Sequence, residues 1–201
     1  AFDAIETPFG KTDKILGGAA TYIGLAASQF DVDSAIISIV GDDMPKEYLD
    51  LLTDRGIDIS ALEIVEGGKT FYWKGKYHND LNTRDTLVTE LNTLGDFNAL
   101  DDLMNVIKHI DVITINDEEA RQLTGEYSLV KAAQKIFTMG PKYVVIKKGE
   151  HGALLFNEDQ IFFAPALPLE EVFDPTGAGD TFAGGFSGYL AASGDSSFEN
   201  M

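Results

Sequence analysis

The sequence predicts an α/β fold in which a mostly parallel sheet is flanked by helices on both faces. Short apolar stretches with the character of buried strands alternate along the chain with amphipathic or small-residue stretches with the character of helices. Such alternation is typical of parallel sheets, because a helical crossover has to connect each strand to the next. The length of 201 residues and an apolar content of 44% suffice for one domain with a core.

The first half of the chain is predicted to contain two helices and a buried strand. Residues 16–30 are rich in glycine and alanine, which predicts a helix that packs closely against a neighbour. Residues 34–40 form a short apolar run and predict the strand, and residues 44–56 have helical periodicity and end at a glycine. The residues of this last helix that are expected to face inward are Met44, Leu49, Leu51 and Leu52.

The second half continues the alternation and closes with a glycine-rich helix. The predicted helices are 99–110, 116–125, 128–140 and 180–193, and the predicted strands are 111–115, 143–147, 152–156 and 160–164. The last two strands are close enough in the sequence to form a hairpin.

One region does not follow the alternation. Residues 70–77 and 86–91 combine aromatic side chains with alternating polar ones. Together with residues 7–15 they predict either a small two-sided β flap or an edge hairpin, and the pattern alone does not separate the two.

Charge and composition exclude several classes of function. The net charge is −18, from 15 basic and 33 acidic residues, so neither nucleic acid nor a membrane surface is an expected partner. A small anion such as a nucleotide stays compatible, because a local site with a metal can override the global field. The chain has no cysteine, which removes disulfides and thiol chemistry, and its 3 histidines have no ligand spacing. No run is long enough for a membrane span and no secretory signal is visible, so a cytoplasmic protein is expected.

Residues 173–186 (FDPTGAGDTFAGGF) raise the main functional question. Pro175 cannot lie inside a helix and helical periodicity resumes near Thr181, so residues 177–179 are predicted to lie at a helix N-terminus. Backbone amides and the positive end of the helix dipole can bind an anion there. Asp180 is then either a capping carboxylate or a base for a hydroxyl that attacks a phosphoryl group. The spacing matches neither a Walker A loop nor a dinucleotide-binding fingerprint.

The segment DPTGAGDTFAGGF resembles the second signature of the ribokinase-like, or PfkB, carbohydrate kinases. Other motifs follow in this family's order, and they are Asp3, Gly17-Gly18, Gly41-Asp42-Asp43, Asn116-Asp117-Glu118-Glu119 and Gly149-Glu150-His151-Gly152. Of these, Gly41-Asp42 fits a turn with a local Asx bond better than a ligand contact. The resemblance implies a ribokinase-like core over residues 1–201 with a β lid at about 5–16 and 64–91. It also implies that family segments are missing before residue 1, near residue 98 and after residue 201.

By this resemblance the chain is an ATP-dependent sugar kinase. Asp180 is then the catalytic base, and the backbone amides of Gly177, Ala178 and Gly179 form an anion hole for the transferred phosphoryl group. An aspartate with an ordinary pKa of about 3.9 is a weak base, which is acceptable because phosphoryl transfer depends mainly on positioning and charge stabilisation.

The resemblance assigns nucleotide binding to two further motifs. Asn116 and Glu119 match a family motif that positions Mg²⁺ and the nucleotide phosphates, often through water, although the same spacing is that of a helix capping box. Gly149 and Gly152 match a loop that passes close to ATP, and a β-turn between strands explains them nearly as well. Lys147 either faces phosphate or solvates a strand end, and it departs from the hydroxyl residue that the family often has there.

Further residues match positions that bind the acceptor or a cation. Asp3 would accept hydrogen bonds from substrate hydroxyls, and Gly17-Gly18 would let the substrate lie against a helix start. A strand-end acid and close helix packing are the structural alternatives for these residues. Thr21 stands where many members carry asparagine, which leaves the identity of the sugar open. Asp174 and Thr176 match positions that hold a monovalent cation, K⁺, in some relatives.

The lid and the acceptor leave alternatives open. The aromatic residues of the flap would cover the substrate and exclude water, and they fit either a homodimer through the lid or a small local core; they are Phe71, Tyr72, Trp73 and Tyr77.

The leading hypothesis is a kinase for a sugar or a related small molecule. The alternatives are a nucleoside kinase of the adenosine type and a catalytically silent nucleotide- or sugar-binding module. A dinucleotide-dependent oxidoreductase shares the α/β pattern but lacks its fingerprint.

Overall fold

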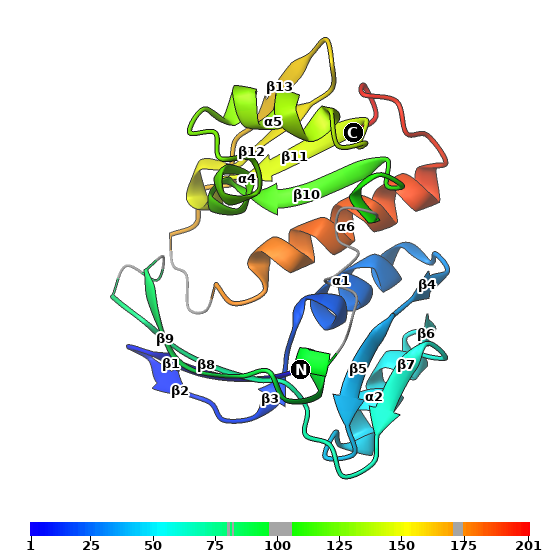
Figure 1. The fold of residues 1–201 in the computed structure, drawn as a ribbon, viewed down its shortest axis with the longest axis vertical. Coiled ribbons are helices and arrows are strands. Elements are labelled where there is room, and N and C mark those ends of the chain that lie inside the picture. Colours follow the sequence, from blue (N-terminus) through cyan, green and yellow to red (C-terminus); the bar gives the residue numbers. More distant parts are fainter. Residues whose placement is uncertain (80, 82, 97–105, 171–174) are drawn as a thin grey trace. The chain divides into compact units, whose positions relative to one another are not determined.

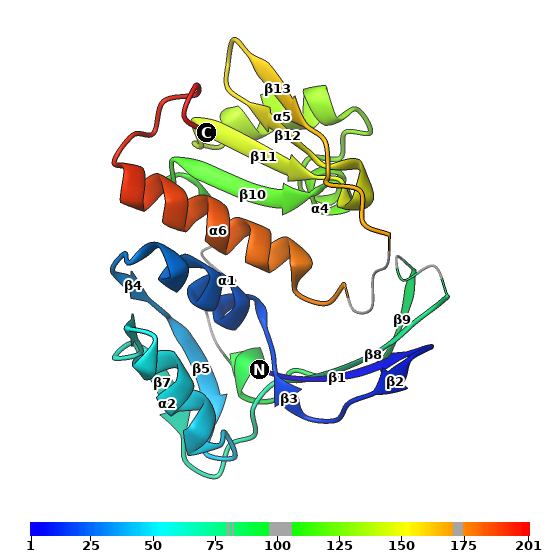
Figure 2. The ribbon, with the colours of Figure 1, turned by 180° about the vertical axis from the view of Figure 1, so that it is seen from behind.

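The computed structural model describes residues 1–79, 81, 83–96, 106–170 and 175–201. The chain forms two compact units. Unit 1 comprises Ala1–Phe97 and Glu171–Met201, and unit 2 comprises Asn98–Glu170. Unit 1 is therefore built from the two ends of the chain, whereas unit 2 is a continuous middle segment (Figures 1 and 2). The expectation of a single core over residues 1–201 stays a prediction.

A five-stranded sheet makes up much of unit 1 (Figure 1). Its strands are β1 (Phe2–Thr7), β2 (Gly10–Lys11), β3 (Ile15–Leu16), β8 (Tyr72–Tyr77) and β9 (Arg84–Glu90). Strand β1 runs parallel to β8 and antiparallel to β2 and β3, while β8 and β9 form an antiparallel hairpin. A short turn, η2 (Asn92–Asp96), follows β9. For residues 7–15, 70–77 and 86–91 the sequence left a flap and an edge hairpin open. In the structure, β8 and β9 form a hairpin, and β1 joins it to β2 and β3 in one sheet.

Two short parallel strand pairs and a helix accompany this sheet. Strand β4 (Ser34–Ala35) pairs with β6 (Ile57–Asp58), β5 (Ser38–Gly41) pairs with β7 (Leu62–Val65), and helix α2 is Lys46–Asp54. The single strand predicted at 34–40 is therefore wrong. The backbone changes its pairing partner at Ile36 and Ile37, and the Ile37 side chain is 74% exposed.

Helix α2 buries less of its surface than the sequence predicts. The helix begins after Pro45, and Leu52 is 5% exposed whereas Leu51 is 38% exposed. Neighbouring residues of a helix point about 100° apart, so with Leu52 at the centre of the buried face Leu51 lies at its edge. The prediction that Leu51 faces inward is wrong, while Met44 and Leu49 are half-buried.

Helices α1 (Ala19–Ala27) and α6 (Ala178–Ser193) lie side by side in unit 1 (Figures 1 and 2). A single turn, η1 (Ser28–Phe30), continues α1. Gly184 of α6 lies against the Ile23 carbonyl and Gly188 lies against Ala27, where no larger side chain would fit. The small residues predicted in both helices therefore allow the two backbones to approach closely. Neither these helices nor any other in the described part of the chain is long and apolar enough to cross a membrane.

In its described residues, unit 2 has a four-stranded sheet with helices α4 and α5 packed on it (Figure 1). In sheet order the strands are β10 (Val112–Asn116), β11 (Tyr143–Lys147), β12 (Ala153–Phe156) and β13 (Ile161–Ala164). Strands β10 and β11 are parallel, and β12 and β13 continue the sheet as the predicted hairpin. The helices are α4 (Asp117–Thr124) and α5 (Leu129–Phe137). The helix predicted at 99–110 lies largely outside the described residues.

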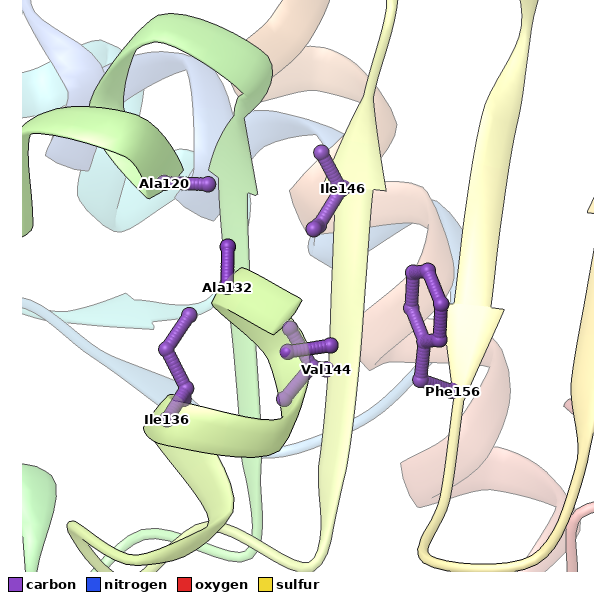
Figure 3. Close-up of a cluster of buried hydrophobic side chains, with 7 residues drawn as sticks. Ala120, Ala132, Ile136, Val144, Ile146 and Phe156 are labelled. Atoms are coloured by element: carbon purple, nitrogen blue, oxygen red, sulfur yellow. The ribbon is translucent and has the colours of Figure 1, made fainter. Parts of the chain in front are cut away.

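The core of unit 2 lies between these helices and one face of the sheet (Figure 3). Its fully buried members are Ala120 of α4, Ala132, Ala133 and Ile136 of α5, Val144 and Ile146 of β11, and Phe156 of β12. Val144 and Ile146 share a face because side chains alternate along a strand. Alanines on both helices bring the helix backbones close to the sheet.

Candidate active site

The side chain of Asp3, on strand β1, is enclosed by residues at the start of α1. Asp3 is 6% exposed. The Gly18 amide donates a hydrogen bond to its carboxylate, and the Tyr22 hydroxyl donates one to Oδ2 at 3.5 Å. Gly17 lies directly against the carboxylate, and a Cβ at that position would clash with it. The glycine pair therefore brings the start of α1 onto this acid.

Burial is the main influence on the titration of Asp3. It raises the pKa of Asp3 above the usual value, while the hydrogen bonds from Gly18 and Tyr22 lower it. The charge of Asp180 is a smaller cause that also raises this pKa. The segments that carry the two acids meet at Tyr22, whose hydroxyl donates to Asp3 and whose ring packs on Gly177.

The glycine turn immediately precedes α6. Gly177 has a φ of 72°, in the left-handed region that favours glycine, and a Cβ there would lie 2.8 Å from the Tyr22 ring. Helix α6 begins at Ala178, so Asp180 lies in its first turn, where the sequence places it. The Ala178 amide donates to the Pro175 carbonyl at 3.1 Å. An anion that used the Ala178 amide would have to replace this bond, and the anion hole stays a prediction.

Thr176 is connected to the five-stranded sheet. Its hydroxyl donates to the Tyr77 hydroxyl at 3.1 Å, and Tyr77 is 4% exposed in a cluster with Ile5 and Leu81. Tyr77 is therefore a core residue, which agrees with the small local core that the sequence left open for the flap aromatics. Asp174, predicted with Thr176 as a ligand of K⁺, lies outside the described residues, so this cation site stays a prediction.

The aromatic residues of β8 are divided between the two faces of the sheet. Asp3 pairs in register with Trp73, so their side chains point to the same face, whereas Tyr72 points to the opposite one. The indole of Trp73 lies over Gly75, and its ring nitrogen donates to Thr86 at 3.3 Å. Trp73 is half-buried and stands beside Asp3 on the same face of the sheet.

The predicted nucleotide motif of unit 2 forms a helix cap. Asn116 Oδ1 accepts a hydrogen bond from the Glu119 amide, and Glu119 Oε2 accepts one from the Asn116 amide, each at 2.8 Å. The capping-box interpretation is confirmed. The cap lies at the carboxyl end of β10, where Asn116 pairs in register with Lys147 of β11. Ligands of open α/β sheets bind at the carboxyl ends of parallel strands, so this cap is compatible with a role beside phosphate.

The loop between β11 and β12 is a tight turn, η4 (Gly149–His151). The Gly152 amide donates to the Gly149 carbonyl at 3.1 Å. Gly152 also lies against the Ala164 carbonyl, where a side chain would not fit. The turn accounts for both glycines, and their contact with a nucleotide stays a prediction.

The motif Gly41-Asp42-Asp43 holds the segment that leads into β8. Asp42 Oδ2 accepts from the Gly67 amide and Asp43 Oδ1 from the Thr70 amide, each at 2.8 Å. The Gly41 amide in turn donates to the Thr70 hydroxyl oxygen at 3.0 Å. The carboxylate bond of Asp42 is therefore long-range, which corrects the expected local Asx bond.

The described residues contain no group of three or more acidic or histidine side chains that could hold a metal ion by themselves. Mg²⁺ in nucleotide sites typically keeps waters and uses one or two carboxylates together with substrate phosphates. Glu119 fits such a contact, because its Oε1 takes no part in the cap. These side chains therefore suit a Mg²⁺ ion that binds together with a nucleotide better than one held by protein ligands alone.

The predicted site residues fall into two groups. Asp3, Gly17-Gly18, Thr21, Thr176, Gly177–Gly179 and Asp180 belong to unit 1, and Asn116, Glu119, Lys147, Gly149 and Gly152 belong to unit 2. Thr21 is buried in α1. Sequence reasoning did not single out Tyr22, which contacts both Asp3 and the glycine turn. The one feature of the sequence that could have pointed to Tyr22 is that a large aromatic residue with a polar end stands among small and aliphatic residues.

Comparison with known proteins decides the family. A model of the pfkB family carbohydrate kinase matches residues 74–199, which is more than half of the chain. The chain belongs to the pfkB family of carbohydrate kinases. The resemblance of the glycine turn is thereby confirmed, and the protein is a kinase of this family.

Relatives of this pfkB-family kinase differ in how much of it they match. Cytidine kinase of Thermococcus kodakarensis is 29% identical over 240 aligned positions, covering 94% of this chain and 85% of that protein. Nucleoside kinase of Methanothermobacter thermautotrophicus is 26% identical over 230 aligned positions, covering 90% of this chain and 73% of that protein. The bifunctional ribokinase/ribose-5-phosphate isomerase A of Fructilactobacillus sanfranciscensis is 37% identical over 90 aligned positions, covering 42% of this chain and 16% of that protein.

A solved structure confirms the fold of the family. An E. coli protein described as a ribokinase II candidate, in complex with ATP and Mg²⁺, has a TM-score of 0.79 to this kinase. The match covers 99% of this chain and 85% of that one at 18% sequence identity. The predicted α/β, ribokinase-like fold is therefore confirmed.

Proposed function

We propose that this pfkB-family kinase transfers the γ-phosphoryl group of ATP to a hydroxyl of a nucleoside, with Asp180 as the base. The observation that carries the proposal is that Tyr22 of α1 contacts both Asp3 and Gly177, the residue before α6, which holds Asp180 in its first turn. An acid that binds the acceptor and an acid that deprotonates it must both reach one acceptor molecule. The shared contact of Tyr22 with the two segments supports this division of roles.

In the proposed reaction, Asp3 accepts hydrogen bonds from the acceptor and Asp180 accepts the proton of the attacking hydroxyl. The hydroxyl oxygen forms a bond to the γ-phosphorus while the bond from that phosphorus to the β–γ bridging oxygen breaks. ADP and the phosphorylated nucleoside are released. Backbone amides of residues 177–179 stabilise the negative charge on the transferred group. Late proton transfer makes a carboxylate base sufficient.

The nucleotide is assigned to the motifs of unit 2. Three residues would bind the phosphates of ATP: Asn116 at the end of β10, Glu119 in the first turn of α4, and Lys147, which pairs with Asn116 on β11. Gly149 and Gly152 would let the backbone pass close to the nucleotide. Glu119 would hold Mg²⁺ through water, and the ion neutralises phosphate charge when it is bound.

The choice of a nucleoside over a free sugar rests on coverage and on one aromatic residue. The relatives that match at least 90% of this chain are named for cytidine and nucleosides, whereas the ribokinase relative matches 42%. A nucleoside also offers a base, and Trp73 stands half-buried on the sheet face that carries Asp3. Stacking of a base on an aromatic ring contributes about 1–3 kcal/mol in nucleic-acid complexes.

A sugar kinase is the second candidate. Its support is the 37% identity to the ribokinase relative, confined to 90 aligned positions. In this case Asp3 would bind sugar hydroxyls directly and Trp73 would only exclude water from the site.

Fluorescence of Trp73 separates the two candidates, because the chain has 1 tryptophan. Cytidine, adenosine, inosine, ribose and fructose are titrated one at a time, and ADP release is measured with each in the presence of ATP and Mg²⁺. A nucleoside kinase should show quenching and turnover with at least one nucleoside and neither with the free sugars. The same titration of free tryptophan controls for light absorption by the base, because it has the fluorophore without the site.

Turnover of ribose or fructose without turnover of any nucleoside would establish the second candidate. A full-length preparation that releases ADP with none of these acceptors would contradict both.

A further inference from the structure

We infer that Tyr22 is a positioning residue that joins the acceptor-binding acid Asp3 to the glycine turn of α6. The inference deepens the proposed function, and it rests on that function in so far as Asp3 binds the acceptor. Tyr22 lies in the first turn of α1, where its amide donates to the Gly18 carbonyl at 3.2 Å. From this place its side chain contacts two segments that are distant in the sequence.

The hydroxyl of Tyr22 acts on Asp3. It donates to Asp3 Oδ2 at 3.5 Å, in addition to the bond from the Gly18 amide, while Gly17 closes one side of the carboxylate. Burial raises the pKa of Asp3, and the two hydrogen bonds lower it. The hydroxyl therefore helps to keep Asp3 ionised and oriented, so that it can accept a hydrogen bond from an alcohol.

The ring of Tyr22 acts on the glycine turn. Three of its carbon atoms would lie 2.8–2.9 Å from a Cβ at Gly177, so the ring packs on bare backbone. Gly177 is the residue before α6, and Asp180 follows in the first turn. The contact therefore sets how closely the start of α1 approaches the start of α6, and with it the separation of Asp3 from Asp180.

Another charged group also acts on the Asp3 carboxyl, because Asp180 of α6 raises the pKa of Asp3. Removing only the Tyr22 hydroxyl leaves this charge in place. A changed titration of Asp3 in such a variant can therefore be assigned to the lost hydrogen bond.

Tyr22→Phe tests the hydroxyl, because it keeps the ring on Gly177. The KM for the nucleoside should rise by about threefold to tenfold with kcat within about twofold, since a bond to a charged acceptor-binding group is lost while the base remains. The KM for ATP should not change. The acid limb of kcat/KM and the NMR titration of the Asp3 carboxyl should both move to higher pH, because the pKa of Asp3 rises.

Tyr189→Phe is the matched control. Tyr189 of α6 donates its hydroxyl to Asn200 at 2.8 Å, so the control removes a similar bond that Asp3 does not share. It should leave KM, kcat and the Asp3 titration unchanged. Tyr22→Leu removes the ring as well, and kcat should then fall by about tenfold while circular dichroism shows a folded protein.

The inference and the proposed function fail in different ways. Unchanged KM and an unchanged Asp3 titration in Tyr22→Phe would overturn the role of the hydroxyl, and an unchanged kcat in a folded Tyr22→Leu would overturn the role of the ring. If the wild-type protein phosphorylates no nucleoside, the proposed function fails. The NMR titration then still decides whether Tyr22 acts on Asp3.

Discussion

The two units of this kinase place their predicted site residues in different ways. Unit 2 is one continuous segment, and its motif is a capping box whose bonds join Asn116 and Glu119, three residues apart. Unit 1 uses both ends of the chain, and the segments that carry Asp3 and Asp180 meet at Tyr22 because α6 packs on α1. The predicted nucleotide side is therefore encoded locally, while the predicted acceptor side depends on long-range packing.

The largest expected effect lies at Asp180, in unit 1. Asp180→Asn keeps the size of the side chain and removes the proposed base, so kcat should fall by about a thousandfold. Binding of a non-hydrolysable ATP analogue, measured by calorimetry, should stay within about twofold, because its proposed side-chain contacts belong to the other unit and the backbone amides of residues 177–179 are unchanged.

Glu47→Gln is the control for this change. It also removes a carboxylate from the first turn of a helix, α2, and should keep the wild-type kcat. Wild-type turnover in Asp180→Asn would mean that the base is another residue.

The next effect tests the packing that assembles unit 1. Gly184→Ala places a methyl group against the Ile23 carbonyl and 2.7 Å from Ala26 Cβ, so the free energy of unfolding should fall by about 1–3 kcal/mol. Gly185→Ala, one residue later, meets nothing within 4 Å and should raise it by up to about 1 kcal/mol, since alanine favours a helix. Urea unfolding measures both variants. Similar effects of the two would show that the approach of α1 and α6 is not what holds unit 1 together.

A smaller effect is expected at the cap of unit 2. Asn116→Ala removes one bond of the capping box and should lower the free energy of unfolding by about 1 kcal/mol. Ser128→Ala, at the start of α5, removes a side chain that makes no capping bond and should be nearly neutral. The KM for ATP should rise only in Asn116→Ala. Lower stability with an unchanged KM would leave Asn116 as a cap and remove it from the proposed nucleotide site.

The smallest effect concerns the pH dependence of stability in unit 1. Because burial raises the pKa of Asp3, the folded chain binds this proton more tightly than the unfolded chain. The contribution of Asp3 to stability is therefore greatest at low pH and is lost as the pH rises from the usual value of 3.8 through the raised pKa. The free energy of unfolding of Asp3→Asn, measured with denaturant across this pH range, should not show this decrease.

Asp58→Asn should change the pH dependence with the opposite sign. Hydrogen bonds from Ser60 lower the pKa of Asp58, so its contribution is present above the usual pKa and is lost as the pH falls. If both variants follow the wild-type curve, neither carboxyl differs between the folded and unfolded chain.

Several elements could be read from the sequence because their signals are local. The strand predicted at 143–147 is β11, Tyr143–Lys147, and the helix predicted at 180–193 is α6, Ala178–Ser193. The spacing of Asn116 and Glu119 correctly predicts a capping box. Strand alternation, helix periodicity and caps each involve residues within a few positions of one another, so neighbouring amino acids suffice to specify them.

Only the tertiary structure decided which distant segments meet. It splits the strand predicted at 34–40 between two partners, buries Tyr77 against the sheet, and places Tyr22 on both Asp3 and Gly177. These contacts depend on how whole helices and strands pack, because a side chain has no local preference for a residue far along the chain. The sequence by itself determined the elements and the glycine turn, and packing decided which residues share a site.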